Sequence, residues 1–193
     1  ITAMDLTGKH VIVTGAAGGI GSALARRFHA AGAQVVLSDL HGADPVAREL
    51  DGTLSIAADI GTQGGNLALI DAAESAFGPV DLFFANAGVG LGTDPMDDES
   101  LWQTSFDVNV HAHRWAARRL LPGWLERGDG YFCSTASAAG LLAQIGSAPY
   151  SVTKHAAVAF AEWLAITYGA RGIRVSCLCP QGVNTAMLHG GDD

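Results

Sequence analysis

The chain has 193 residues, of which 49% are hydrophobic and 16% are charged, and its formal net charge is −8. This composition excludes a disordered or low-complexity protein, and an acidic chain without a Lys/Arg cluster is poorly suited to bind nucleic acid or an anionic membrane surface. The length fits one domain with a sizeable core, so we expect residues 1–193 to form a single domain.

Targeting and metal-binding signals are absent from the sequence. It has no run of about 18 apolar residues, and its start, ITAMDLTGKH, lacks the basic and apolar parts of a signal peptide, which predicts a cytoplasmic protein. Cys133, Cys177 and Cys179 lie in apolar, strand-like runs, as expected for reduced thiols. No metal site is predicted, because no Cys/His pair with ligand spacing follows these cysteines, and His111 and His113 face different sides of their predicted helix.

Short apolar or β-branched runs alternate six times with segments of helical periodicity. Between the first two runs, for example, the spacing of Ile20, Leu24 and Phe28 predicts a helix that ends near Gly32. This alternation predicts an α/β fold, a doubly wound parallel sheet with helices on both faces, whose ligands bind at the carboxyl ends of the strands. The predicted strands are residues 10–14, 34–38, 53–58, 80–86, 130–135 and 173–179.

A glycine-rich loop, TGAAGGIG, follows the first predicted strand and opens a helix. Glycine lets the backbone approach a pyrophosphate, and a helix N-terminus offers unpaired N–H groups to it. The spacing of Gly15, Gly19 and Gly21 differs from G-x-G-x-x-G, so the loop predicts nucleotide binding without naming the nucleotide. A turn needed only for tight packing of strand and helix is the alternative.

Asp39 ends the second predicted strand, eighteen residues after Gly21. An acidic group there accepts hydrogen bonds from the ribose hydroxyls of an adenosine and repels a 2′-phosphate. Because residues 16, 17, 40 and 41 include no Lys or Arg, the sequence favours NAD over NADP. A capping or turn aspartate is the alternative interpretation.

Tyr150 and Lys154 are four residues apart at the start of a long predicted helix. Residues at this spacing share one helix face, and a nearby ammonium favours the phenolate form of a tyrosine. A surface tyrosine beside a solvated lysine has the same spacing, so the pair becomes informative only together with the nucleotide loop.

With these motifs the chain resembles the short-chain dehydrogenase/reductase family, from about Asp5 to Met187. Each motif is common, but their order and spacing together are highly specific. The resemblance implies a single-domain Rossmann fold and an oxidoreductase that moves a hydride between NAD(H) and an alcohol or ketone. The matching motifs are TGAAGGIG, AADI at 57–60, NAG at 86–88, Asn109 in DVNV, STASAAG at 134–140, YSVTK at 150–154 and PQGVNT at 180–185.

The resemblance also implies residue roles. Asp59 and Ile60 would bind the adenine, Asn109 would hold a proton-relay water, and Ser137 is preferred over Ser134 because it precedes AAG and lies thirteen residues before Tyr150. The catalytic set would be Asn109, Ser137, Tyr150 and Lys154, and the cofactor set would be Gly15, Gly19, Ile20, Gly21, Asp39, Asp59, Ile60, Asn86, Ala87, Gly88, Tyr150, Lys154, Pro180, Val183 and Thr185.

Two features depart from the family pattern. Gln181 stands where the family usually has glycine, and the sequence stops at HGGDD, where relatives continue into a substrate-covering segment and one more strand. We therefore expect a C-terminally truncated chain that lacks the last strand of the sheet. The remaining pocket, near residues 141–149, Val89 and Met187, is largely apolar and favours an uncharged secondary alcohol or ketone. An ordinary role of these residues in core and loops is the alternative.

Two other functions remain open from sequence. One is an NAD-binding sensor without turnover, which the short C-terminus favours and the intact Ser137, Tyr150 and Lys154 oppose. The other is a nucleotide-sugar epimerase or dehydratase, because Gly18 also permits that loop spacing. The resemblance further implies a homodimer or homotetramer through helices near 99–126 and 150–169.

Overall fold

The computed structural model describes residues 4–185 and forms one six-stranded sheet in which every strand is parallel to its neighbours. The strand order is β3-β2-β1-β4-β5-β6, so the chain runs outward from β1 to β3 and then returns to start again at β4. The strands are β1 (His10–Thr14), β2 (Gln34–Asp39), β3 (Leu54–Ala57), β4 (Leu82–Ala85), β5 (Gly130–Thr135) and β6 (Ile173–Leu178).

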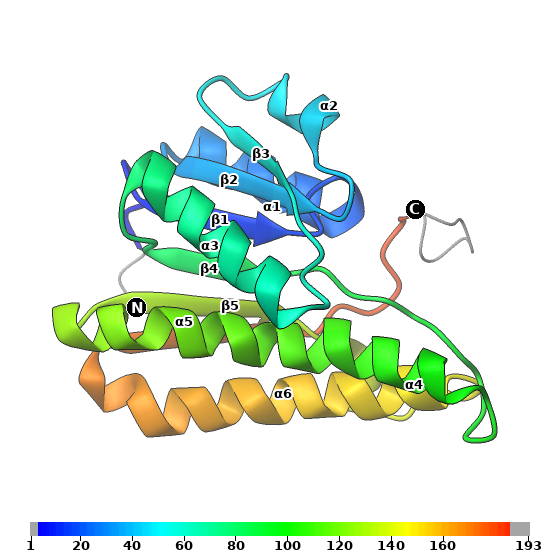
Figure 1. Cartoon of the computed structure of the whole chain (residues 1–193). Helices are drawn as coiled ribbons and strands as arrows, with labels where there is room; N and C mark the ends of the chain where they lie inside the picture. The colour runs from blue at the N-terminus through cyan, green and yellow to red at the C-terminus, as the bar shows by residue number, and fades with distance from the viewer. Residues whose placement is uncertain (1–3, 186–193) are drawn as a thin grey trace.

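Helices cover both faces of the sheet, as Figure 1 shows. One apolar core joins the sheet to α3, α5 and α6, and a second core lies on the opposite face, against α1 and α2. The predicted doubly wound α/β fold is thus confirmed. The helices are α1 (Gly19–Ala30), α2 (Asp44–Ala47), α3 (Gln63–Phe77), α4 (Glu99–Phe106), α5 (Ala112–Arg127) and α6 (Ala148–Tyr168).

The strand order reverses between β1 and β4, and the functional motifs gather there. Both strands are buried along their whole length, β1 is rich in β-branched residues and β4 contains two phenylalanines, a pattern typical of central parallel strands. Crossovers leave β1 and β4 in opposite directions, which opens a crevice at their carboxyl ends. In Figure 1 the strand arrows point toward the right, the side on which α4 and α6 begin.

Individual residues explain where several of the helices begin and end. Gly32, just past α1, has φ of +85°, which explains why the helix stops there as the sequence predicts. Asp98 caps α4 by accepting a 2.8 Å hydrogen bond from the Ser100 N–H. Helices are expected near residues 99–126, and the structure has α4 and α5 there, joined by a π-helical turn at Asp107–His111 that carries Asn109.

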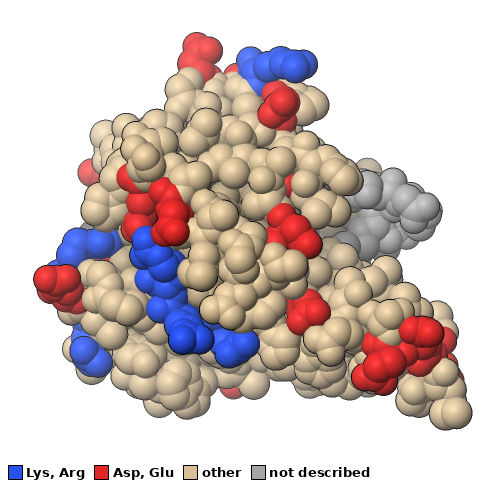
Figure 2. Space-filling view, in the orientation of Figure 1, with Lys and Arg blue, Asp and Glu red and all other residues tan. Residues whose placement is uncertain are grey.

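The surface charges are distributed unevenly (Figure 2). Arg119 on α5 bonds Asp71 at 2.8 Å and Glu74 at 2.7 Å on α3, which joins two neighbouring helices.

Within residues 4–185, no helix is both long and apolar enough to cross a membrane. Cys133, Cys177 and Cys179 are free thiols, as predicted.

Candidate active site

The glycine loop places backbone where a side chain would not fit. Gly15 and Gly19 have φ of +62° and +50°, a region that favours glycine. A Cβ on Gly21 would lie 1.9 Å from the Gly15 carbonyl oxygen, and a Cβ on Gly15 would lie 2.8 Å from the Cα of Ala87. The loop therefore packs directly on Asn86 and Ala87, which with Gly88 form the predicted cofactor floor. Helix α1 begins at Gly19, with Ile20 in its first turn.

Asp39 ends β2 and turns its carboxylate toward the glycine loop. One carboxylate oxygen accepts from the Ala17 N–H at 3.0 Å, and the other accepts from the Leu40 N–H at 2.8 Å. An ionised carboxylate has about four lone-pair positions, so each oxygen keeps capacity for a further donor. Asp39 thus stabilises its own turn and still presents acceptors beside the glycine loop. Its position is compatible with a turn aspartate and with a ribose-binding carboxylate at the same time.

The predicted adenine-binding residues lie next to Asp39. The Ala58 N–H donates to the Asp39 carbonyl at 2.9 Å, which holds the segment after β3 against the end of β2. Asp59 accepts from the Gly61 N–H at 3.0 Å, and the Ile60 carbonyl accepts from the Asn66 side-chain amide at 2.9 Å. Both predicted residues are therefore held at the carboxyl edge of the sheet.

Asn86 ties the floor together at the reversal point of the sheet. Its amide donates to the carbonyls of Thr14 at 3.0 Å and of Gly15 at 3.2 Å, and its oxygen accepts from the Thr135 hydroxyl at 2.9 Å. The Thr14 hydroxyl in turn accepts from the N–H groups of Asn86 and Ala87, at 3.0 and 3.1 Å. Three neighbouring strands, β1, β4 and β5, are thereby joined at their ends.

Asn109 is fully buried in the π-helical turn, and its side chain is hydrogen-bonded on both sides. The amide donates to the Val89 carbonyl at 2.9 Å and to the Thr153 hydroxyl at 3.0 Å, while the oxygen accepts from the Val89 N–H at 2.9 Å. π-Helical turns occur often at functional sites. This arrangement fixes Asn109 between the segment after β4 and the first turns of α6.

Lys154 is 3% exposed and donates from its ammonium to the Thr135 carbonyl at 3.0 Å. Burial lowers the pKa of Lys154 to about 8, against the opposing influence of the Cys177 and Cys179 thiols. A Cβ on Gly88 would lie 3.0 Å from this ammonium and 3.2 Å from the Asn109 side-chain oxygen, so Gly88 is wedged between them.

Tyr150 and Lys154 do lie together on α6. The helix begins at Ala148, with Pro149 in its first turn, so Tyr150 stands at the start and Lys154 one turn later. The Lys154 ammonium lies 5.5 Å from the centre of the Tyr150 ring. The face shared by these two residues, predicted from their spacing, is present in the structure.

Ser137 follows β5 and caps the short turn Ala138–Gly140 by accepting from the Ala139 N–H at 3.1 Å. The turn lies against α6, because a Cβ on Gly140 would be 2.6 Å from the Lys154 carbonyl oxygen. Ser134 is fully buried within β5. Ser134 thus lies inside the strand predicted over residues 130–135, and Ser137 lies in the turn that follows it.

The segment after β6 crosses from the serine turn toward the glycine loop. The Pro180 carbonyl accepts from the Ala138 N–H at 2.8 Å, and the Thr185 methyl group would lie 3.0 Å from a Cβ on Gly19. Val183 between them is 38% exposed. The predicted pocket residue Met187 lies outside the described residues.

Sequence reasoning missed three hydroxyl-bearing residues that support this site. Thr14 and Thr135 hold Asn86, Thr135 also receives Lys154, and Thr153 holds Asn109. Threonine is common at strand ends and inside helices, so nothing in the sequence singles out Thr14 or Thr135. Only Thr153 could have been recognised as part of the site, because it lies inside the YSVTK motif. Across residues 4–185, no group of three or more His, Cys, Asp or Glu side chains is arranged to hold a metal ion.

The sequence profile of the short chain dehydrogenase family matches residues 9–192. The chain is 38% identical to 1-deoxy-11-beta-hydroxypentalenate dehydrogenase of Streptomyces exfoliatus, over 97% of this chain and 72% of that protein. It is 35% identical to 3beta-hydroxysteroid dehydrogenase 1 of Eggerthella lenta, over 95% of this chain and 74% of that protein.

Solved structures of dehydrogenases and reductases also match the chain. A 3-ketoacyl-(acyl-carrier-protein) reductase from Brucella melitensis, complexed with NADH, superposes with a TM-score of 0.91 at 32% identity, over 96% of this chain and 80% of that one. A short chain dehydrogenase/reductase from Burkholderia phymatum, in complex with NAD, gives 0.89 at 31% identity, over 96% and 69%. The predicted family and fold class are confirmed: the chain belongs to the short-chain dehydrogenase/reductase family of oxidoreductases.

Proposed function

We propose that the protein transfers a hydride between NAD(H) and the carbinol carbon of an uncharged secondary alcohol, with the ketone as the oxidised partner. The observation that carries this proposal is the placement of Tyr150 and Lys154 on one face of α6, beside the buried Asn109 and the turn that begins at Ser137. Two relatives are named as dehydrogenases of hydroxy compounds, a hydroxypentalenate and a hydroxysteroid.

The residues fit a dinucleotide and favour NAD. The Gly15, Gly19 and Gly21 backbone leaves no room for side chains and opens α1, whose N-terminus attracts a pyrophosphate. Asp39 keeps acceptors for ribose hydroxyls and repels a 2′-phosphate. Two solved relatives are complexes with NADH and NAD, in agreement with the predicted cofactor. When bound, the nicotinamide would supply the hydride acceptor or donor.

Tyr150 acts as the acid/base in this proposal. In the oxidation direction its oxygen takes the proton of the substrate alcohol while the carbinol carbon loses its hydride. Lys154 places a positive charge beside Tyr150, because with a pKa of about 8 it is still mainly an ammonium at neutral pH. No ion pair among residues 4–185 includes Lys154, so a carboxylate does not neutralise its charge.

Ser137 orients the substrate oxygen. Its own oxygen accepts from the Ala139 N–H, which leaves the hydroxyl proton available to donate to the substrate. Asn109 acts in proton relay, as the family resemblance implies, and its three hydrogen bonds keep its segment in place. Cofactor floor and catalytic groups then belong to one domain, residues 1–193.

Two surface features support an uncharged substrate. Leu141, Leu142 and Ile145, between Ser137 and Tyr150, are 61%, 72% and 99% exposed. The neighbouring loop before α4 contains Asp94 and Asp97, and residues 86–106 include no Lys or Arg. Acidic side chains therefore dominate the lower right of Figure 2, where an anionic substrate would be repelled.

The assembly and the location are further parts of the proposal. Val152, Trp163 and Ile166 on α6 are 46%, 54% and 84% exposed, and large exposed apolar side chains on one element often mark an interface. We expect a homodimer or homotetramer in which this face of α6 is covered, in the cytoplasm. Light scattering of the purified protein would contradict this assembly if it gave the mass of a single chain.

Turnover is the test that separates the candidate functions. The 193-residue protein is supplied with NAD⁺ or NADP⁺ and a panel of secondary alcohols, and NADH formation is followed by absorbance. We expect NAD⁺-dependent turnover that Tyr150→Phe reduces about 10²–10⁴-fold and that Tyr168→Phe, a matched change at the far end of α6, leaves intact. NADH binding without turnover of any alcohol would favour the sensor, and turnover of a nucleotide sugar would favour the epimerase.

A further inference from the structure

A small cavity lies next to the predicted cofactor floor. Its volume is about 10 Å³, and its wall includes Thr14, Ile60 and Ala87 from the floor, together with Asn66 from α3 and His113 from α5. The remaining lining is apolar. The cavity therefore lies between the predicted cofactor floor and α3 and α5, two of the helices that cover this face of the sheet.

His113 contributes two unpaired polar atoms to this place. The residue is 1% exposed, and neither ring nitrogen hydrogen-bonds a protein group within the described chain. Its ring packs edge-on against Phe132, with the ring centres 6.2 Å apart. Burial, together with the nearby charge of Lys154, lowers the pKa of His113 to about 3, so the imidazole is neutral at physiological pH. A neutral imidazole offers one donor and one acceptor.

Asn66 contributes a third unpaired atom. The residue is 1% exposed, and its amide nitrogen donates to the Ile60 carbonyl at 2.9 Å, which directs the amide toward the floor. Its side-chain oxygen has no hydrogen-bond partner among residues 4–185. Buried polar groups are nearly always satisfied, because an unsatisfied one loses its hydration without compensation.

The size and polarity of the cavity fit one water molecule. A buried water needs about 10–15 Å³ and two to four polar partners. We infer that one structural water occupies this cavity, donates to the Asn66 side-chain oxygen and bonds one ring nitrogen of His113.

This water would join two halves of the site. Asn66 already holds the Ile60 carbonyl, and Ile60 belongs to the segment expected to bind the adenine. His113 lies four residues after Asn109, where the π-helical turn passes into α5. The bridge from Asn66 through water to His113 therefore ties the adenine-side segment to α5, the helix that continues the π-helical turn carrying Asn109, a link that rests on the proposed function.

The water itself is tested without any nucleotide. In rotating-frame NMR spectra of the 193-residue protein, we expect cross-peaks between a long-lived water and both the His113 ring protons and the Asn66 side-chain amide. His113→Phe should remove the Asn66 cross-peak, whereas His111→Phe, the same change two residues earlier and outside the cavity lining, should leave it. A folded wild-type protein with neither cross-peak would overturn the inference.

Thermal stability provides a second test of the water bridge between Asn66 and His113. Asn66→Leu and His113→Phe should each lower the melting temperature, and the double variant should lose less than the sum, because both singles break one shared bridge. Strictly additive losses would overturn the shared bridge.

NADH affinity tests whether the water bridge also supports the cofactor site. His113→Phe should weaken NADH binding several-fold, and His111→Phe should not; unchanged NADH affinity in a His113→Phe protein that has lost the water would overturn the link. If wild-type protein binds no NADH, the proposed function fails, while the cross-peaks still decide the water.

Discussion

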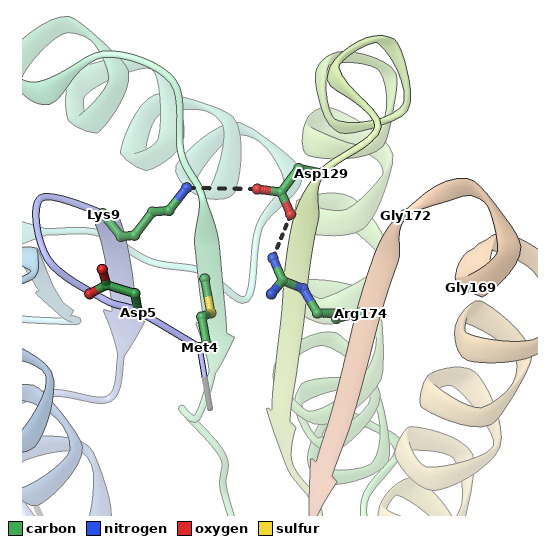
Figure 3. Close-up of a pocket in the computed structure, with 7 residues that line it drawn as sticks. All are labelled: Met4, Asp5, Lys9, Asp129, Gly169, Gly172 and Arg174. Carbon is green, nitrogen blue, oxygen red and sulfur yellow. Dashed lines mark hydrogen bonds and ion pairs between the residues drawn. The ribbon is translucent and has the colours of Figure 1, made fainter. Parts of the chain in front are cut away.

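The two edges of the sheet handle charge in opposite ways. At the amino edge, an open groove of about 540 Å³ is lined by Lys9, Asp129 and Arg174 (Figure 3). Lys9 lies 3.4 Å from Asp81 and 3.7 Å from Asp129, and Arg174 also bonds Asp129. The groove is spacious, but its charged groups already satisfy one another.

At the carboxyl edge the ammonium of Lys154 is buried, and within residues 4–185 the acceptor of its hydrogen bond is the neutral carbonyl of Thr135. The N-terminus of α1 follows Gly18, which has no side chain to cap it. The positive charge of Lys154 and the N–H donors at the start of α1 therefore remain available to a ligand. A large groove alone therefore does not identify a binding site, and polar groups without a charged partner are the better indication.

The largest expected effect concerns the carboxyl edge. In Gly21→Ala the new methyl group would lie 1.9 Å from the Gly15 carbonyl and 2.7 Å from the Asn86 amide, so the loop must move. We expect NADH affinity, followed by fluorescence titration, to fall at least about 100-fold, a loss of about 2.7 kcal/mol. Gly64→Ala is the control, since a Cβ there meets nothing within 4 Å and its site is on α3. Normal affinity in Gly21→Ala would contradict the packed loop.

The next effect is the pH dependence of stability caused by Lys154. Its pKa falls from 10.5 to about 8 on folding, so between these pH values the unfolded state binds more protons and the free energy of unfolding rises with pH. The slope approaches about 1.4 kcal/mol per pH unit at most. Urea titrations from pH 7 to 10.5 should show this rise in wild type relative to Lys154→Met, and parallel curves would contradict a buried, desolvated ammonium.

A smaller effect is expected at Thr153, which connects Asn109 to α6 through a 3.0 Å hydrogen bond. In Thr153→Val the Asn109 amide loses a buried acceptor, and we expect kcat to fall about tenfold, equivalent to about 1.4 kcal/mol, with NADH affinity unchanged. Thr153→Ser keeps the hydroxyl and should restore kcat. Equal kcat values for the Val and Ser variants would show that the hydroxyl has no positioning role.

The smallest effect is expected at the amino edge. The side chains of Arg174 and Asp129 are 45% and 43% exposed, and ion pairs of this kind contribute about 0–1 kcal/mol. Arg174→Gln should therefore lower the melting temperature by no more than about 4 °C and leave kcat and KM unchanged. A loss of activity comparable with that of Thr153→Val would break the distinction between the two edges.

The sequence predicted most of the fold because its signals were local. The strands His10–Thr14 and Gly130–Thr135 appear with the predicted bounds, and other boundaries differ by one or two residues, as at Leu82–Ala85, where Asp81 and Asn86 turn out of the strand to make side-chain hydrogen bonds. The π-helical turn at Asp107–His111 was not predicted, because no periodicity distinguishes one extra residue in a helical turn.

The candidate site was predicted as a set of residues but not as a network. Spacing placed Tyr150 and Lys154 on one face, whereas the contacts of Lys154 with Thr135 and of Asn109 with Thr153 join residues 19 and 44 positions apart. The burial of His113 in the same cavity wall as Asn66 could not be predicted either, because Asn66 on α3 is distant from it in sequence.

The most direct measurement is an NMR titration of the 193-residue protein with NADH, in which backbone amide shifts are followed at both edges of the sheet. Binding at the carboxyl edge predicts large shifts at Gly15, Gly21 and Ala87 and none at Gly172 and Arg174 around the amino-edge groove. Shifts centred on that groove, with the glycine loop unchanged, would contradict the assignment of the site.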